Sequence, residues 1–289
     1  MVGCGCLCVE YDVVESWDGF KWAVGRGRGH EYDVEVLSKG ELSVLRALGS
    51  VASKDVVFCD VGAFVGYYTV RLAARVREVH SFEPNPVSRA TLLRNVELNR
   101  LSNVKVYPYA LGDRSEVRRL YLMAPGSTLL EGYGGWGCVD VEVKTLDEVL
   151  DWVDVVKVDV EGYEWNVVQG MMGLIRRCRP FIVVEHHDFR HYKINTYGLI
   201  KDLLKREGYR VVYLTEPHRF YWHGSRPVGV VKPLLVNHWV NHCLRNVMEG
   251  RDWYYGLPYD WWWGMSLVDF IYELPEHVEK EELWVKLLE

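Results

Sequence analysis

Residues 55–86 read DVVFCDVGAFVGYYTVRLAARVREVHSFEPNP, and this stretch decides the fold. Its first apolar run, Val56 to Cys59, is short and rich in β-branched and aromatic residues, which is typical of a strand buried on both faces. A glycine-containing turn and a segment with helical spacing follow it. A second strand, Glu78 to Phe82, then ends at an acid. The order strand, glycine turn, helix, strand predicts half of a nucleotide-binding α/β unit.

The turn has the pattern D-x-G-x-x-x-G, formed by Asp60, Gly62 and Gly66. We expect Gly62 to let the backbone bend sharply and to leave room for a ligand, and Gly66 to let the helix pack closely on the sheet. The start of that helix offers free N–H groups and a positive dipole end. Because the dinucleotide fingerprint G-x-G-x-x-G is absent, the pattern favours a nucleoside ligand without a pyrophosphate.

Glu83 follows the second strand, 23 residues after Asp60. An acid at this position can accept hydrogen bonds from two ribose hydroxyls, and the expected separation is about 20 residues. The alternative is a βαβ unit whose glycines serve packing alone.

Composition limits the class of protein. The chain has 289 residues, of which 49% are hydrophobic, and a formal net charge of −6. These values predict one large α/β domain with additions and argue against a surface that coats nucleic acid. The sequence contains no run of about 18 apolar residues, so we expect no membrane-spanning helix. Its first residues lack the pattern of a signal peptide. The chain has seven cysteines, an odd number, which suits a reducing compartment, so we predict a cytoplasmic protein. It has one glutamine and many charged residues, a composition that tends to occur in proteins of hyperthermophiles.

The segments before residue 55 predict a hairpin and a helix. The alternating stretches Val9–Trp17 and Tyr32–Leu37 would pair around a basic glycine tip. Ser38 and Glu41 then have the spacing of a capping box for a helix to about Leu48.

Further strands and helices follow Pro86. A helix is expected from Val87 to Asn99, with Ser88 as one candidate cap, and a strand over 104–110. Strands over 116–122 and 139–143 would extend or flank the sheet. Residues 125–137 between them are either a lid over the substrate or a plain hairpin excursion.

Acids gather after two later strands. A strand ending near Val158 leads to Asp159 and Glu161, with a helix over 164–174. A strand over 180–184 leads to Glu185-His186-His187-Asp188. A helix over 196–207 and a strand over 209–214 complete this part. In open α/β sheets, ligands bind at the carboxyl ends of the strands, where these groups lie.

These segments together resemble a known family. DVGAFVGYYT, FEPNP, TLDEVL, KVDVEGYEWNVVQGM and PFIVVEHH occur in the order seen in the FkbM family of methyltransferases, over residues 55–215. The resemblance implies a doubly wound, mostly parallel seven-stranded sheet and the cofactor S-adenosylmethionine. It also implies a hydroxyl on a sugar, glycan or small molecule as the acceptor. We therefore divide the chain into an N-terminal extension (1–50), a cofactor-binding core (51–216) and a segment (217–289) that completes the sheet and carries an aromatic-rich extension.

The resemblance also assigns residues. Gly62, Ala63 and Phe64 would face the methionine part of the cofactor, Glu83 the ribose, and Asp159 the sulfonium or amino group. The whole predicted cofactor set is Asp60, Gly62, Ala63, Phe64, Gly66, Glu83, Pro84, Asn85, Ala110, Leu111 and Asp159, with Ala110 and Leu111 bordering the adenine.

Several residues are candidates for the general base that takes the proton from the acceptor. Glu161, His186 and His187 all follow core strands. His186 is the first choice, since a neutral imidazole accepts a proton near pH 7, and Glu161 and Asp159 complete the predicted catalytic set. The alternative is that the histidine is a structural hydrogen-bonding group. Asp159, Glu161, Glu185, His186 and Asp188 could also surround a Mg²⁺-like ion. The spacing does not force them together, so no metal is predicted, either there or at Cys4, Cys6 and Cys8.

Two other classes of function stay open. One is an RNA or protein methyltransferase, against which the acidic charge and the lack of an N-P-P-Y tetrapeptide weigh. The other is a non-catalytic nucleotide-binding scaffold. The tryptophan-rich residues 217–289 would cover the core, stack on a sugar or form an oligomer interface.

Overall fold

The computed structural model describes residues 11–25, 42–122, 126–131, 137–187, 196–215 and 218–223. Its strands are β1 (Tyr11–Glu15), β2 (Lys21–Gly25), β3 (Val57–Val61), β4 (Glu78–Phe82), β5 (Val104–Tyr107), β6 (Ala110–Leu111), β7 (Glu116–Tyr121), β8 (Cys138–Lys144), β9 (Val155–Val158), β10 (Phe181–Glu185), β11 (Tyr209–Thr215) and β12 (His218–His223). Its helices are α2 (Leu42–Val51), α3 (Tyr67–Ala73), α4 (Pro86–Leu98), α5 (Leu146–Val149), α6 (Glu164–Gln169), α7 (Met172–Cys178) and α9 (Thr196–Arg206).

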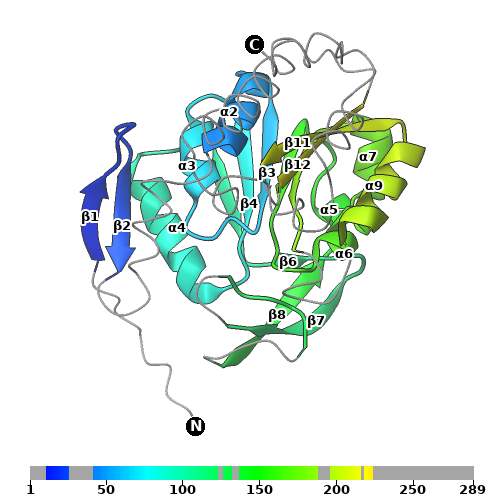
Figure 1. Cartoon of the computed structure of the whole chain (residues 1–289). Coiled ribbons are helices and arrows are strands. Elements are labelled where there is room, and N and C mark those ends of the chain that lie inside the picture. The colour runs from blue at the N-terminus through cyan, green and yellow to red at the C-terminus, as the bar shows by residue number, and fades with distance from the viewer. Residues whose placement is uncertain are drawn as a thin grey trace, which may run out of the picture.

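The central sheet has the strand order β11-β12-β10-β9-β3-β4-β5 (Figure 1). The five strands from β10 to β5 are parallel, whereas β12 pairs antiparallel with both β10 and β11. The side on which the chain adds strands changes at β3. The strands β4 and β5 are added on one side of β3, and β9 and β10 are added on the other. This is the switch point at which open α/β sheets bind their ligands. The predicted class of fold, a parallel α/β sheet, is confirmed.

Helices cover both faces of this sheet, because its strands are short apolar runs whose successive side chains point to opposite faces. On one face, α2 and α3 pack on the sheet through buried residues that include Val44, Leu48, Val70, Phe58 and Val79. On the other face, α5, α6, α7 and α9 contribute Leu146, Val167, Ile175 and Ile200, which pack with Cys59 and Val61. The consecutive residues Phe58 and Cys59 thus belong to different cores.

A second sheet of three strands, β6-β8-β7, lies at the carboxyl side of the main sheet. The strand expected over 104–110 is therefore two strands: β5 ends at Tyr107, and Ala110 and Leu111 pair with β8 instead. The strands expected over 116–122 and 139–143 form this sheet with β6 rather than extending the main one. Of the loop between them, residues 126–131 are described.

The N-terminal hairpin differs from the expected one. β1 pairs with β2 around a turn at Gly19, so the second strand is Lys21–Gly25 and not residues 32–37. Trp22 on β2 is fully buried. The hairpin lies against α4 (Figure 1), whose Asn95 side chain accepts a hydrogen bond from the backbone N–H of Ala23. The basic tip and the capping box at Ser38 lie outside the described residues.

Two helix boundaries also differ. The N-cap of α4 is Asn85, whose side chain accepts hydrogen bonds from the N–H groups of Val87 and Ser88, so Ser88 is not the cap. The helix expected over 164–174 is two helices, α6 and α7. Between them, the backbone of Gly112 approaches Gly170 so closely that a Cβ at Gly170 would overlap it, so this position requires glycine.

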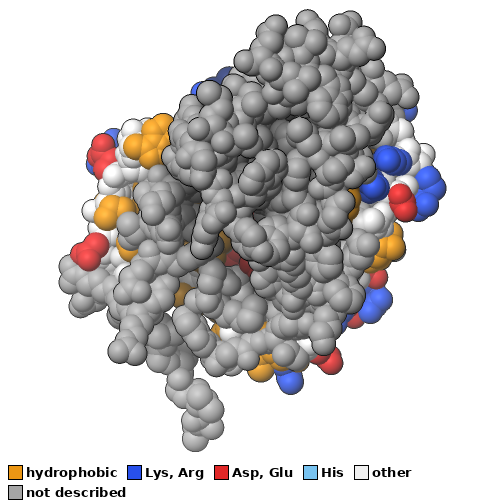
Figure 2. Space-filling view, in the orientation of Figure 1, with side chains coloured by type: hydrophobic (Ala, Val, Ile, Leu, Met, Phe, Trp, Pro, Cys, Tyr) orange, Lys and Arg blue, Asp and Glu red, His pale blue; other side chains and the backbone are white. Residues whose placement is uncertain are grey.

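The described surface mixes both signs of charge. Along the edge formed by α7 and α9, Figure 2 shows Lys and Arg side chains beside Asp and Glu side chains. One such pair is Arg176 with Glu207, at 2.7 Å. Within the described part of the chain, no helix has both the length and the apolar character that crossing a membrane requires. The predicted aromatic extension and the cysteine cluster at 4–8 lie outside the described residues.

Candidate functional site

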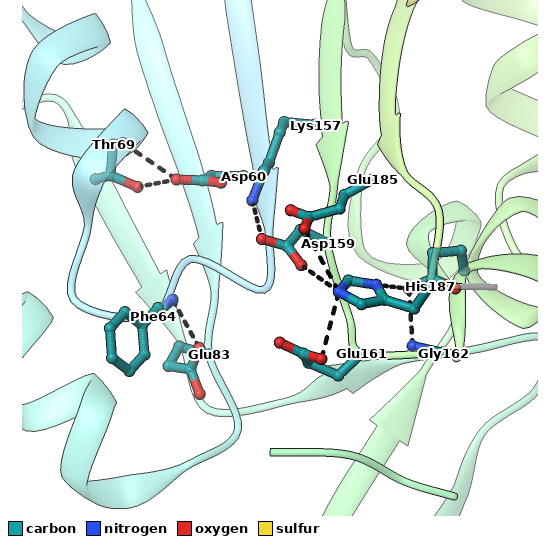
Figure 3. A network of polar contacts seen from close by, with 11 residues as sticks. Asp60, Phe64, Thr69, Glu83, Lys157, Asp159, Glu161, Gly162, Glu185 and His187 are labelled. Carbon is teal, nitrogen blue, oxygen red and sulfur yellow. Dashed lines mark hydrogen bonds and ion pairs between the residues drawn. The ribbon is translucent and has the colours of Figure 1, made fainter. Parts of the chain in front are cut away.

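Polar side chains from four neighbouring strands converge at the carboxyl edge of the main sheet (Figure 3). Asp60 lies in β3, Glu83 follows β4, Asp159 and Glu161 follow β9, and Glu185 and His187 lie at the end of β10. Parallel strands deliver their ends to one edge, so groups far apart in the sequence meet there.

The glycine turn after β3 is fastened to the end of β4. The N–H groups of Gly62 and Ala63 both donate to the carbonyl of Phe82, and the N–H of Phe64 donates to Glu83 Oε2 at 2.7 Å. These three N–H groups are thus used within the chain, and only other atoms of this turn can meet a ligand.

Gly62 has φ +78°, which confirms the sharp bend that the sequence predicts. On the side where a Cβ would lie, the carbonyl oxygen of Asp159 fills the space beside Gly62, and room for a ligand elsewhere along this backbone stays a prediction. Gly66, at φ +93°, allows close approach of Leu92 on α4, 2.5 Å from where its Cβ would lie, rather than of the sheet. Both glycines are required by packing between parts of the chain.

Asp60 is fully buried beneath the turn. Its Oδ2 accepts hydrogen bonds from the N–H of Thr69 at 3.1 Å and from its hydroxyl at 2.6 Å, which holds the first turn of α3 in place (Figure 3). Burial raises the pKa of Asp60, while the charge of Lys157 opposes that rise. The contacts give Asp60 a part in holding the turn; a direct contact with the cofactor stays a prediction.

Glu83 carries the feature that best fits a nucleoside. Both of its oxygens accept one backbone N–H, Oε2 from Phe64 and Oε1 from Asn85 at 2.9 Å. A carboxylate has about four acceptor positions, so two remain for hydroxyl donors such as those of a ribose. Burial raises the pKa of Glu83 to about 7, against the opposing effect of the two N–H groups.

The neighbours of Glu83 serve the chain itself. The carbonyls of Glu83 and Pro84 accept hydrogen bonds from Arg89. Asn85 caps α4 with its Oδ1 and donates its Nδ2 to the Ser127 hydroxyl at 3.1 Å. Asn85 thereby joins the loop over 126–131 to the end of β4.

Ala110 and Leu111 are buried in β6. Ala110 packs with Tyr163 beside the second sheet, and Leu111 packs with Phe82 and Val158 at the ends of β4 and β9. This position beside the strand ends is compatible with the predicted border of an adenine, which stays a prediction.

Lys157 and Asp159 form an ion pair between the cofactor turn and the acidic cluster. Lys157 Nζ lies 2.7 Å from Asp159 Oδ2, and the lysine is 2% exposed. The two residues are separated by one position at the end of β9, and such residues point to the same face. The other oxygen of Asp159 faces His187 (Figure 3).

His187 is surrounded by four carboxylates. Its Nδ1 lies 2.8 Å from Glu164 Oε1, while its Nε2 lies 3.3 Å from Glu161 Oε2, 3.5 Å from Glu185 Oε1 and 3.9 Å from Asp159 Oδ1. Burial by itself lowers the pKa of His187, but the carboxylates, Glu164 foremost, raise it well above its ordinary value.

Glu161 is held in an unusual conformation. It has φ +53°, a left-handed backbone that is uncommon for a side chain of this kind. The Thr128 hydroxyl donates to the Glu161 carbonyl at 2.6 Å, and Gly126 lies so close that a Cβ there would overlap the Glu161 carboxylate. The described part of the 125–137 loop therefore fixes Glu161, which is a constraint typical of functional sites.

His186 points away from this cluster. Its Nε2 lies 3.0 Å from the hydroxyl of Tyr221 on β12, and its Nδ1 3.3 Å from the hydroxyl of Thr196 on α9. The ring is buried, at 4% exposure. These contacts give His186 a place in the packing of α9 and β12 against β10, and it is His187 that joins Asp159 and Glu161.

Three residues of the site were missed by sequence reasoning: Lys157, Glu164 and Thr128. The first two stand in the K-x-D-x-E-G-x-E pattern, so the pairing of Lys157 with Asp159 follows from their shared strand face. Glu164 opens α6 and is completely buried. Nothing in the sequence marked Thr128, because its partner Glu161 is far from it along the chain.

The chain is similar in sequence to known methyltransferases. The family model described as "Methyltransferase FkbM domain" matches residues 60–211. "Methyltransferase 1" of Beauveria bassiana is 26% identical over 186 residues, which are 54% of this chain and 73% of that protein. "Hexuronic acid methyltransferase AglP" of Haloferax volcanii is 30% identical over 159 residues, which are 52% of this chain and 63% of that protein.

Among solved structures, the chain is similar to the crystal structure of methyltransferase FkbM from Methylobacillus flagellatus KT, with a TM-score of 0.44 and 18% identity. The match covers 59% of this chain and 44% of the other. The chain thus spans less than half of that protein and under two thirds of the archaeal relative.

Proposed function

The chain belongs to the FkbM family of S-adenosylmethionine-dependent methyltransferases, and we propose that its site transfers the methyl group to a hydroxyl of a sugar, glycan or small molecule. The observation that carries the proposal is that two groups of side chains with different chemistry lie along the carboxyl ends of the parallel strands. Glu83 offers acceptor positions suited to a ribose at one end, and the cluster of Asp159, Glu161 and His187 lies at the other.

The cofactor, when bound, supplies an activated methyl group on a positively charged sulfur. The chain's own task is to bind, orient and desolvate. Glu83 accepts the ribose hydroxyls in its ionised form. Asp159, whose charge is held in place by Lys157, lies between that position and His187 and is suited to face the positive part of the cofactor.

The acidic cluster receives the acceptor. When the hydroxyl oxygen bonds to the methyl carbon and the carbon–sulfur bond breaks, the hydroxyl proton must leave. Glu161 is the carboxylate of the cluster with the greatest side-chain exposure, at 26%, and we assign it the proton. His187 Nε2 lies 3.3 Å from Glu161 Oε2, so His187 serves as a positioning residue for Glu161.

A sugar acceptor is favoured by one relative and by the site. The relative from Haloferax volcanii is named for a hexuronic acid, and the cluster offers carboxylate oxygens that accept hydrogen bonds from sugar hydroxyls. The mixed charge along the α7–α9 edge in Figure 2 lacks the single-sign stripe typical of RNA binding, within the described surface of that view. A cytoplasmic location is part of the same proposal, supported by the buried free thiol of Cys59.

The test is methyl transfer from S-adenosylmethionine to a panel of neutral sugars, hexuronic acids, peptides and transfer RNA, followed by mass spectrometry. We expect a mass gain of one methyl group on a sugar hydroxyl. We expect Glu161→Gln to lower kcat at least 100-fold, since it removes the proton acceptor, with an unchanged affinity for S-adenosylhomocysteine, because Glu83 at the ribose end is untouched. Glu142→Gln on β8, at 63% side-chain exposure, is the matched control.

Methylation of RNA or peptide alone would replace the sugar proposal. Full kcat in Glu161→Gln would remove Glu161 as the proton acceptor. Failure of the well-folded protein to bind S-adenosylhomocysteine would contradict the proposed site itself.

A further inference from the structure

The nitrogen Nε2 of His187 faces oxygens of three carboxylates, and these are atoms that ligate metal ions. From this arrangement we propose that Asp159, Glu161 and His187 form a site for one divalent cation of the Mg²⁺ or Mn²⁺ kind. The proposal rests on the proposed function for the purpose of the cation, but its binding is testable without either substrate.

The distances suit such an ion. In an octahedral site with bonds of about 2.1 Å, neighbouring ligand atoms are about 3.0 Å apart and opposite ones about 4.2 Å apart. Nε2 lies 3.3 Å from the Glu161 oxygen and 3.9 Å from the Asp159 oxygen, between these two values. One atom from each of the three residues fits within a group whose members are all within 4.8 Å of one another. Small side-chain rotations are therefore enough to place all three on one ion.

Glu164 orients the histidine for this role. A histidine that binds a metal through one nitrogen usually donates the other N–H to a carboxylate, which fixes its tautomer. Here Glu164 Oε1 lies 2.8 Å from Nδ1 and also accepts the N–H of Gly162. Glu164 is completely buried, and its second oxygen has no hydrogen-bond partner among the described residues. Since a buried carboxylate needs a positive partner, it holds a proton on Nδ1 and directs Nε2 toward the acids.

That orientation points Nε2 at oxygens of three carboxylates, so a cation among them would be bound by nitrogen and oxygen together. A lone pair of Nε2 facing oxygens of Glu161, Glu185 and Asp159 is repulsive, and either a proton or a metal ion between them removes the repulsion. A metal ion does so while binding several oxygens at once. Two carboxylates with one imidazole, and no thiolate, suit Mn²⁺ or Mg²⁺ rather than a soft metal.

The location gives the ion a purpose. All three ligands are partly exposed, with side-chain exposures of 24% for Asp159, 26% for Glu161 and 12% for His187, so the remaining coordination positions can be filled from solvent. An acceptor with neighbouring hydroxyls can fill two of these positions and is thereby oriented with one oxygen near the cofactor. This deepens the proposed function by selecting acceptors that carry adjacent oxygens.

The test is a titration of the full chain with Mn²⁺, with the free ion measured by electron paramagnetic resonance and neither cofactor nor sugar present. We expect one bound Mn²⁺ per chain that Mg²⁺ displaces. We expect Glu161→Gln and Asp159→Asn each to weaken the affinity at least tenfold, with Glu142→Gln unchanged. Circular dichroism and the melting temperature identify any variant that has not folded, and the two isosteric substitutions make it improbable that both fail.

Absence of Mn²⁺ binding by the folded wild type at millimolar concentration would overturn the proposal and leave a proton as the charge on Nε2. Binding that both folded variants retain would place the ion elsewhere and would also overturn it. Because S-adenosylhomocysteine binding is measured separately, failure of the cation site does not count against the methyltransferase proposal, and the reverse holds as well.

Discussion

The most informative single perturbation is Glu83→Gln, because Glu83 is buried and has a raised pKa. Burial raises this pKa from an ordinary value of 4.5 to about 7, so the folded chain holds a proton that the unfolded chain loses in that range. The resulting stabilisation is fully present below pH 4.5 and is lost as the pH rises through 7. At 1.36 kcal/mol per pKa unit, the free energy of unfolding falls by about 3 kcal/mol over this window.

Glutamine does not titrate, so this part of the pH dependence disappears in Glu83→Gln. The amide can accept only one of the two N–H groups that Glu83 accepts, from Phe64 and Asn85, which costs about 1–3 kcal/mol at every pH. We therefore expect the variant to be less stable than the wild type at pH 5. At pH 8 it should be as stable or slightly more so.

Cofactor binding has the opposite dependence, because ribose hydroxyls donate to the ionised carboxylate. With a pKa of about 7, roughly one tenth of Glu83 is ionised at pH 6 and nine tenths at pH 8. We expect the Kd for S-adenosylhomocysteine to fall about tenfold over that range in the wild type. In Glu83→Gln it should be weak and independent of pH.

Urea unfolding and calorimetric titration at pH 5, 6, 7 and 8 measure the two effects. The control is Glu78→Gln at the other end of β4, where the carboxylate pairs with Lys105 at the surface and has a lowered pKa outside this range. A difference in unfolding free energy between Glu83→Gln and wild type that stays constant from pH 5 to 8 would refute the reasoning, since Glu83 would then titrate as an ordinary acid.

Three further substitutions test the packing that holds the site. Gly62→Ala forces a Cβ onto the carbonyl of Asp159 at φ +78°, and we expect a loss of about 2–4 kcal/mol in urea unfolding; an unchanged midpoint would contradict the close approach. His186→Gln should lower stability by about 1–3 kcal/mol and leave kcat within twofold, whereas a hundredfold fall in kcat in the folded variant would restore His186 as the base. Arg71 on α3 forms an ion pair with Asp18 in the turn between β1 and β2. Arg71→Met removes this pair, so we expect the free energy of unfolding to fall by about 3 kcal/mol and hydrogen exchange in the hairpin to become faster. Unchanged exchange there would show that the pair does not hold the hairpin against α3.

Much of the central fold is predictable because its elements are local patterns. The strands β3, β9 and β10 are short, mostly apolar runs with an acid at or just beyond the end, and β3 and β4 flank a glycine turn and a helix. Such runs are buried on both faces, so their composition alone marks them. The predicted pairing of the first strand with residues 32–37 is wrong, because β1 pairs with Lys21–Gly25, and the burial of Trp22 in the core is not visible in the local alternation.

Local patterns alone predict acids at the ends of neighbouring parallel strands, since these acids stand at or just beyond buried runs. The choice of His186 over His187 as the base has no such basis, because the two are adjacent and identical, and it stays a prediction. Side chains of consecutive residues at a strand end point to opposite faces. The tertiary structure gives the two rings different surroundings, because α9 and β12 surround His186 on one face while Glu164 and the end of β9 lie beside His187 on the other. Likewise, the space beside Gly62 is filled by Asp159 from a strand far along the chain, which no local pattern records.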